Sequence, residues 1–439
     1  MRFLILILCL FGARIAVAQV SLPGVRLPLP GGVLSNLPLT GPSLEPRLDA
    51  EFAGTDLRDL RALQIRTLLR KHSDVIEADP QGNPIVRGEV LAVAPSAAAL
   101  QAAATLGFSV VRESTPAAEG SRLVVLHVAS HTARALARLE AADTGGVYDF
   151  NHIYLESGVA IAARSVGRQT LRAEEGTGGG VAVRATRVGL IDSGIDPAHE
   201  VFQGVPLHQH GCAGRVVPDE HGTAVASVLV GRAASFHGAA PGSELYAADV
   251  YCGLPTGGAV DAVAEGLSWL IQEGVPVINV SLAGPANRVL EGVVRRALAG
   301  GHLLVAAVGN DGPAAPPLFP AAWPGVVGVT GVDARRQVLV EAERGPQVKF
   351  AAPAAQMAAA RLPTGYTLVR GTSFAAPIVA GLLALDLAAP DKEAADRAVA
   401  ALARDAIPLG SSRPNTVYGF GLVGEALRRQ PVLTTLRAN

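Results

Sequence analysis

The sequence predicts an α/β fold, in which a parallel sheet is covered by helices on both faces and is preceded by a small α+β domain. From residue 186 onward, strands that are apolar throughout alternate with helical patterns, as expected of strands buried between two helical layers. Before that, residues 86–156 alternate short strands and helices in the order βαββαβ. A segment of different composition, 157–185, separates the two patterns and indicates two domains.

The small domain is expected to be ferredoxin-like, because βαββαβ is the order of that fold. The expected strands are 87–95, 108–115, 121–129 and 146–156, and the expected helices are 96–107 and 130–143. An amphipathic helix at roughly 56–72 precedes it. The apolar side of this helix carries Leu57, Leu60, Leu63, Leu68 and Leu69. This helix either packs onto the neighbouring domain or binds a partner.

The larger domain is expected to contain strands that end at one edge of a sheet, where α/β proteins bind their ligands. The expected strands are 186–192, 243–251, 275–283, 302–310 and 325–333. The expected helices are 221–233, 261–274, 287–301, 373–389 and 391–406, followed by a closing stretch at 417–430.

Composition fits a globular protein with a large core. Of 439 residues, 49% are hydrophobic and 17% are charged, which argues against general disorder. The net charge of −1 argues against a nucleic-acid partner.

The first 18 residues read as a secretory signal. Arg2 is followed by an apolar run, and Ala16 and Ala18 are small residues at the positions expected before a cleavage site. The alternative is an N-terminal membrane anchor, but the apolar run is short for a bilayer. We therefore expect a secreted or periplasmic protein without a stable membrane span.

The remaining segments are assigned from their composition and from their order in the chain. Residues 19–47 are a Pro/Gly-rich linker, and 48–156, the helix plus the ferredoxin-like domain, are expected to be a pro-region. Residues 157–185 are expected to be a linker, 186–430 the larger domain and 431–439 a tail. The run GTGGG at 176–180 lacks the lysine of a phosphate loop and is interpreted as a connector.

Two cysteines remain once the signal is removed. Cys212 and Cys252 form an even pair in an exported chain, which favours a disulfide. Neither a metal site nor a cysteine nucleophile fits this spacing as well.

Polar residues stand where the predicted sheet should carry its site. Asp192 ends a strand, His221 begins a helix, Asn310 ends a strand and Ser373 begins a helix within GTSFAAP. Taken alone, Ser373 fits a helix cap better than a nucleophile. Together, the residues provide a hydroxyl, a base, a carboxylate and an oxyanion donor, which are the groups that acyl transfer requires.

The motifs IDSGID, HGTAVAS, VAAVGNDGP and GTSFAAP, in this order, resemble those of subtilisin-like (S8) serine endopeptidases. INVSLAGP at 278–285 resembles the substrate-binding strand of that family, and YGFGLV at 418–423 its closing motif. The resemblance covers residues 186–428. It implies that 186–430 are a catalytic domain with a subtilisin-like parallel sheet and that the linker 157–185 holds the processing site. It also implies that the pro-region assists folding, inhibits the enzyme and is removed by autoprocessing.

The resemblance assigns a role to each residue. Asp192, His221 and Ser373 would form the catalytic triad, and Asn310 would bind the oxyanion. The substrate-binding residues would be Ser281, Leu282, Ala283, Gly284, Ala306, Ala307, Val308 and Gly309.

This chain departs from the family pattern at a few positions. Ala224 replaces a histidine outside the triad, so activity is expected to persist. Ala283 and Val308 carry added methyl groups near the pocket for P1, the residue that provides the carbonyl of the bond cut. A preference for small or medium P1 side chains is therefore expected.

The expected partners are a protein or peptide substrate and the chain's own pro-region. No cofactor is expected to be required, and the sequence places no calcium site although calcium is common in the family. One alternative is a catalytically weak homologue that acts as a protein-binding module. An esterase fits poorly, because the chain has no G-x-S-x-G motif and its triad order differs.

Overall fold

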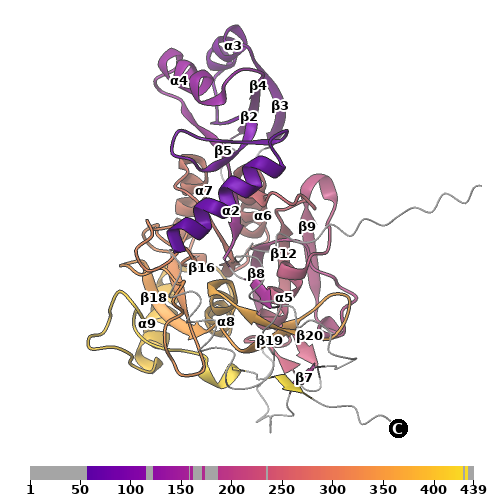
Figure 1. The fold of residues 1–439 in the computed structure, drawn as a ribbon, viewed down its shortest axis with the longest axis vertical. Helices are drawn as coiled ribbons and strands as arrows, with labels where there is room; N and C mark the ends of the chain where they lie inside the picture. Colours follow the sequence, from indigo (N-terminus) through magenta and orange to yellow (C-terminus); the bar gives the residue numbers. More distant parts are fainter. Residues whose placement is uncertain are drawn as a thin grey trace, which may run out of the picture.

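The computed structural model describes residues 57–114, 122–157, 159–161, 171–173, 186–233, 236–428 and 431–433. The expected signal at 1–18, the linker at 19–47 and the glycine run at 176–180 lie outside the described residues. Figure 1 shows a small domain standing on a larger one, with α2 (Leu57–Lys71) lying obliquely across their junction.

The larger domain is built on a seven-stranded sheet in the order β18-β17-β16-β14-β8-β12-β9, and every neighbouring pair is parallel. The strands are β8 (Arg187–Asp192), β9 (Leu207–Gly211), β12 (Glu244–Asp249), β14 (Val277–Val280), β16 (Leu303–Ala307), β17 (Val327–Val332) and β18 (Val348–Pro353). This is the parallel sheet that the sequence predicts. The strand expected over 275–283 is interrupted at Ser281 and continues as the separate β15 (Leu282–Ala283).

Helices cover both faces of this sheet. Alternate residues of a strand face opposite sides, so strands that are apolar throughout make both faces of the sheet apolar, and both must be buried. In β16, Leu303 and Val305 belong to the core cluster that contains residues of α5 (Glu220–Val230) and α8 (Thr372–Ala384). Leu304 and Ala306 belong to the cluster that contains residues of α6 (Val260–Gln272) and α7 (Arg288–Ala299). The last helix of the domain is α9 (Lys392–Asp405).

The small domain has the expected element order βαββαβ. Its elements are β2 (Pro84–Val93), α3 (Ala97–Thr105), β3 (Phe108–Ser114), β4 (Leu123–Val128), α4 (Thr132–Ala142) and β5 (Val147–Glu156). The strands pair antiparallel in the order β5-β2-β4-β3, and β1 (Ile76–Ala78) adds to β2. Leu126, Leu139 and Tyr148 belong to the domain's own core.

One strand joins the two domains. β5 continues beyond the small sheet and pairs antiparallel with β13 (Gly258–Ala259) and β15 of the larger domain. Figure 1 shows it above α6 and α7. Beyond residue 158, β6 (Val159–Ile161) pairs with β20 (Tyr366–Arg370), which also pairs with β19 (Met357–Ala360). The segment expected to be a linker therefore contains strand structure on the larger domain.

The remaining elements within the described ranges are short. They are β7 (Leu171–Ala173), β10 (Arg232–Ala233), β11 (Phe236–His237), β21 (Pro431–Leu433) and three 3-10 turns at Glu200–Phe202, Cys212–Gly214 and Glu425–Leu427. Over the part of the chain that the structure describes, every helix is too short or too polar to cross a bilayer.

Candidate active site

Asp192 and His221 are brought together where β8 ends and α5 begins. Asp219 caps α5 by accepting a hydrogen bond from the backbone N–H of His221, which places the imidazole in the first turn. The two nearest atoms, His221 Nδ1 and Asp192 Oδ1, are 2.8 Å apart, and the side chains are 5% and 0% exposed. A Cβ added to Gly222 would lie 2.1 Å from the carbonyl oxygen of Ser193, so only glycine allows this close approach.

The charges around His221 favour its protonated form. Burial lowers the pKa of His221, but the negative charges of Asp192 and Glu156 and the hydrogen bond to Asp192 outweigh it and raise the pKa to about 9. Burial raises the pKa of Glu156 to about 7, although the charge of His221 opposes the rise. Asp219 and Asp192 add to the rise. Glu156 is therefore an electrostatic neighbour of the imidazole.

Ser373 lies in the first turn of α8 and does not cap it. The N-cap is Gly371, at φ 132°, and it forms no side-chain capping bond, so the interpretation of Ser373 as a helix cap is wrong. The Ser373 hydroxyl donates to the backbone carbonyl of Ser281 at 3.0 Å. Among the described residues, His221 Nε2 has no hydrogen-bond partner. The structure thus joins Asp192 to His221 but does not join His221 to Ser373 by a hydrogen bond.

A backbone carbonyl occupies the position between the expected oxyanion donors. The oxygen of Ser157 accepts a hydrogen bond from the backbone N–H of Ser373 at 3.0 Å and a second from the side-chain amide of Asn310. The Asn310 side-chain oxygen accepts from the backbone N–H of Thr372 at 3.2 Å, which orients the amide. β16 ends at Ala307, so Asn310 lies in the following loop and does not end the strand, contrary to expectation.

The chain on either side of Ser157 lies extended across the larger domain. Before it, β5 pairs with β15 through Glu156 and Leu282, and with β13 through Tyr154 and Gly258. After it, β6 pairs with β20, the strand that leads into Ser373. A peptide bound for cleavage needs this arrangement, with strand pairing on both sides and one carbonyl between the oxyanion donors.

The expected substrate-binding residues fall into two groups. Leu282 and Ala283 form β15 and pair with β5, which places them along the bound strand. A Cβ added to Gly284 would lie 2.5 Å from the Tyr154 ring, so this glycine leaves space for the tyrosine. The second group, Ala306, Ala307, Val308 and Gly309, spans the end of β16 and the loop after it, and the side chains of its first three members are buried in the core.

Some residues beside this site were not expected from the sequence. These are Glu156 and Ser157 at the end of the small domain, and Asp311 and Glu343 beside Asn310. Ser157 directly follows the last predicted strand of the small domain, and that position was the one available signal. Nothing in the sequence around Asp311 and Glu343 connects them.

The predicted disulfide is present. Cys212 and Cys252 are bonded, with Cα atoms 5.4 Å apart and a sequence separation of 40. Asp249 holds the neighbouring loop, because its carboxylate accepts backbone hydrogen bonds from Val217, Tyr251 and Cys252. The described residues contain no group of three or more His, Cys, Asp or Glu side chains placed to hold a metal ion.

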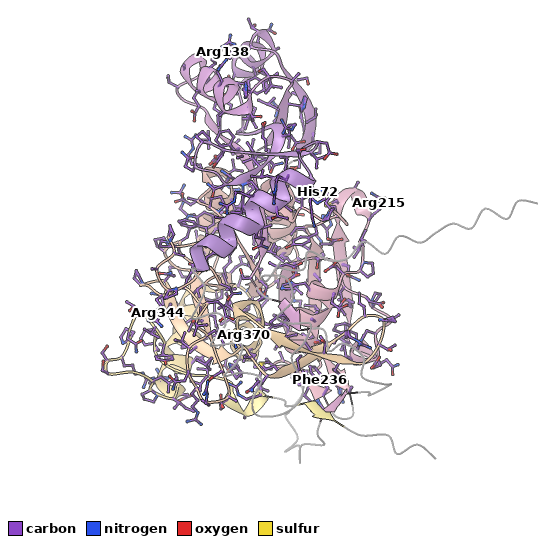
Figure 2. All side chains as sticks on the ribbon, viewed as in Figure 1. His72, Arg138, Arg215, Phe236, Arg344 and Arg370 are labelled. Atoms are coloured by element: carbon purple, nitrogen blue, oxygen red, sulfur yellow. A yellow bond between two sulfur atoms is a disulfide. The ribbon has the colours of Figure 1, made fainter. Side chains whose placement is uncertain are left out.

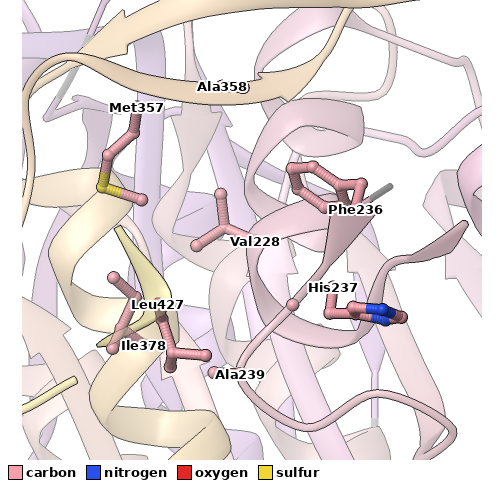
Figure 3. Close-up of a pocket in the computed structure, with 9 residues that line it drawn as sticks. Val228, Phe236, His237, Ala239, Met357, Ala358, Ile378 and Leu427 are labelled. Atoms are coloured by element: carbon pink, nitrogen blue, oxygen red, sulfur yellow. The ribbon is translucent and has the colours of Figure 1, made fainter. Parts of the chain in front are cut away.

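An apolar pocket lies elsewhere in the larger domain (Figure 3). Its lining residues come from α5, β11, β19, α8 and the last 3-10 turn, and include Val228, Phe236, Met357, Ile378 and Leu427. Val228 is seven residues after His221 on α5, which places it about 10 Å further along the helix. The pocket lining provides no carboxylate or nucleophile, and we assign the chemistry to the Asp192–His221 site.

Comparison with known proteins agrees with this geometry. The model of the Subtilase family matches residues 184–421. The minor extracellular protease Epr of Bacillus subtilis (strain 168) is 28% identical over 250 residues, covering 56% of this chain and 38% of Epr. Subtilisin DY of Bacillus licheniformis is 31% identical over 245 residues, covering 54% of this chain and 88% of that protein. The chain thus spans little more than a third of the first relative and most of the second.

Solved structures share the fold. Fervidolysin from Fervidobacterium pennivorans, described as a keratinolytic enzyme related to subtilisin, superposes with a TM-score of 0.65 at 19% identity, covering 82% of this chain and 63% of that one. A mutant of the protease domain of PatA superposes with a TM-score of 0.50 at 26% identity, covering 56% of this chain and 96% of that one. The similarity to fervidolysin extends well beyond the larger domain.

Proposed function

Because the chain belongs to the subtilase family, we propose that it is an exported serine endopeptidase, made as a precursor that cleaves itself. It hydrolyses peptide bonds through an acyl-enzyme on Ser373. The observation that carries the proposal is the Ser157 carbonyl, which lies between the backbone N–H of Ser373 and the side-chain amide of Asn310.

The first half of the reaction forms the acyl-enzyme. The Ser373 hydroxyl leaves the carbonyl of Ser281, turns to the unpartnered Nε2 of His221 and gives up its proton as Oγ attacks the carbonyl carbon. Asp192 keeps the proton of the neutral imidazole on Nδ1 and stabilises the imidazolium that forms. The oxyanion stays between the Ser373 N–H and the Asn310 amide.

The second half releases the products. His221 delivers its proton to the nitrogen of the leaving amine, and the peptide bond breaks. Water then attacks the acyl-enzyme, with His221 again taking the proton, and the Ser373 hydroxyl is restored. Atoms and charges therefore balance with water as the co-reactant.

In the precursor, the bond aligned for this reaction is the one that follows Ser157. Ser157 is P1, and Glu156, Leu155 and Tyr154 are P2 to P4. The expected boundary between pro-region and linker, after residue 156, then moves by one residue. The pro-region would end at Ser157, and the mature chain would begin at Gly158.

The same geometry supports an inhibitory pro-region. β5 covers the strand β15 that would pair with a substrate, and Tyr154 is fully buried on the larger domain. The small sheet also packs on α6 and α7. Cleavage after Ser157 does not remove these contacts. The cut pro-region therefore stays bound and continues to cover β15, and inhibition ends only when it dissociates or is degraded.

Export rests on the sequence and on the disulfide. The signal pattern at 1–18 directs secretion or transfer to the periplasm, and the Cys212–Cys252 disulfide suits an oxidising compartment.

The decisive test compares the wild-type precursor with Ser373→Ala. The wild type should be cut and the variant should stay intact, and a fluorophosphonate should label the processed wild type at Ser373. Equal cutting of the two chains would refute autoprocessing. Absence of labelling would favour the binding-module alternative, for which the missing His221–Ser373 hydrogen bond is the supporting observation.

A further inference from the structure

We propose that Asp311 and Glu343 form a subsite for an arginine or lysine side chain at P1, and that Arg61 of α2 fills this subsite in the precursor. The inference rests on the proposed function, since it names a substrate preference for the same active site. A bound guanidinium, an unpartnered buried carboxyl oxygen and the position of both acids beside the oxyanion donors carry it.

The guanidinium of Arg61 shows what Asp311 accepts. Its Nε lies 2.9 Å from one carboxylate oxygen of Asp311, and its Nη1 lies 3.2 Å from the other. The two side chains are 16% and 14% exposed, so the pair is largely shielded from water. Two parallel hydrogen bonds of this kind are how a carboxylate recognises arginine. An N-terminal helix thus provides the group that a substrate arginine would provide.

Glu343 is fully buried close to this pair, and one of its carboxyl oxygens lacks a hydrogen-bond partner among the described residues. Oε2 accepts a hydrogen bond from the backbone N–H of Leu318 at 3.2 Å, whereas Oε1 has no partner among the described residues. Burial raises the pKa of Glu343 to about 9; the charge of Asp311 adds to the rise, and that of Arg61 opposes it. Leaving a buried polar atom unpaired is unfavourable, so its retention points to a ligand.

Both acids border the residues that hold the P1 carbonyl. Asp311 directly follows Asn310 in the chain. A Cβ added to Gly309 would lie 2.6 Å from Oε1 of Glu343, so this oxygen faces the backbone just before Asn310. The P1 side chain is attached one bond from the carbonyl carbon. It must therefore pass close to these residues. In the precursor P1 is Ser157. Its side chain is too short to occupy the place beside the acids, which Arg61 takes instead.

Removal of the pro-region takes Arg61 away and leaves the carboxylate of Asp311 without its cation. Glu343, whose pKa is about 9, is protonated at neutral pH and becomes an anion when a bound cation lowers that pKa. A basic P1 side chain then restores the missing charge, and a guanidinium can bond both oxygens of Asp311, which an ammonium cannot do as well. This proposal departs from the expectation of small or medium P1 residues, because arginine and lysine side chains are long. Val308, one basis of that expectation, is buried in the core, where its Cγ1 would lie 3.3 Å from a Cβ added to Gly328.

The test uses the mature enzyme and fluorogenic peptides Tyr-Leu-Glu-Xaa, in which Xaa is Ser, Gln, Lys or Arg. We expect kcat/KM for Arg to exceed that for Gln by about ten- to hundredfold, the range expected for hydrogen bonds to a charged group. The ratio should fall toward one in Asp311→Asn and in Glu343→Gln. Asp396→Asn, a substitution of an exposed acid on α9, is the control and should keep the wild-type ratio.

A binding measurement separates this inference from catalysis. In the uncut Ser373→Ala precursor, benzamidine should bind only when Arg61→Ala has also been introduced. An Arg-to-Gln ratio near one in the wild type, or a ratio unchanged in both acid variants, would overturn the subsite. Absence of hydrolysis of every peptide, together with absence of fluorophosphonate labelling, would instead overturn the proposed function.

Discussion

The backbone N–H of Ser373 donates a hydrogen bond to the carbonyl oxygen of Ser157 at 3.0 Å. This contact joins the first turn of α8 to the residue at the end of the small domain, 216 positions earlier in the chain (373 minus 157). Because the helix N-terminus presents free N–H groups and favours negative charge, the same contact would strengthen as the carbonyl becomes an oxyanion. The proposed cleavage after Ser157 requires its carbonyl in this position.

Asn310→Ala should slow autoprocessing without preventing folding. The substitution removes one of the two donors to the Ser157 carbonyl. The rate should fall by about 10²–10³-fold, the magnitude measured for loss of the corresponding donor in subtilisin itself. The measurement is the first-order rate of precursor cleavage on a gel. A rate within twofold of wild type would show that Asn310 does not stabilise the transition state.

Glu156→Gln should shift the pH dependence of autoprocessing toward lower pH. With its pKa near 7, Glu156 is an anion above neutral pH, and it helps to raise the pKa of His221 to about 9. His221 must be neutral to act as a base, so the precursor should speed up as pH rises toward 9. Removing the anion lowers the pKa of His221, and the midpoint should fall by about one unit.

Cleavage rates of the wild-type and Glu156→Gln precursors, measured between pH 5 and 10, provide the comparison. Glu77→Gln is a suitable control, because Glu77 lies in β1 of the same small domain and pairs with Arg87 rather than with the active site. An unshifted midpoint in Glu156→Gln would mean that Glu156 does not act on the imidazole.

Tyr154→Ala should loosen the complex between pro-region and enzyme after cleavage. The tyrosine ring is fully buried beside Gly284, and its hydroxyl donates to the carbonyl of Pro285. Truncating a central buried aromatic typically weakens binding by about 2 kcal/mol or more, which is roughly 30-fold in the dissociation constant.

Recovery of peptidase activity on dilution of the freshly processed complex measures this constant. Val111→Ala, at a residue of the small domain that is 46% exposed, should leave it unchanged. If Tyr154→Ala and Val111→Ala behaved alike, the tyrosine would not anchor the pro-region.

Arg370→Met should destabilise the larger domain. Nε and Nη2 of Arg370 donate to the two oxygens of Glu341 at 2.6 and 2.8 Å, and the side chains are 1% and 8% exposed. Figure 2 shows Arg370 within the larger domain. The backbone carbonyl of Glu341 also accepts from Gly312, so the pair connects the loop after Asn310 to the strand before Ser373.

Removal of one partner from a buried ion pair leaves an uncompensated charge and lowers the free energy of unfolding by about 3–5 kcal/mol. Denaturant titration in the Ser373→Ala background measures this loss. Arg397→Met is the matched control, because its ion pair with Glu393 is exposed and should contribute little. Equal losses from the two substitutions would contradict a special role for the buried pair.

The sheet, its helices and the Asp192–His221 contact could be predicted because they depend on local patterns. Apolar strands predict a buried parallel sheet, and polar residues after such strands must converge at one edge. The orientation of the Ser373 hydroxyl could not be predicted, since it depends on a rotamer and on the carbonyl of Ser281. The Arg61–Asp311 ion pair spans 250 positions and follows from domain packing, which no local pattern encodes.

The most direct test of the account is the chemical identity of the ends created when the wild-type precursor cuts itself. Mass spectrometry of the two fragments should find a pro-region that ends at Ser157 and a mature chain that begins at Gly158. The Ser373→Ala precursor should contain the same bond intact. First cleavage at a bond between 162 and 185, with the bond after Ser157 still intact, would contradict the assignment of Ser157 as the residue held for cleavage.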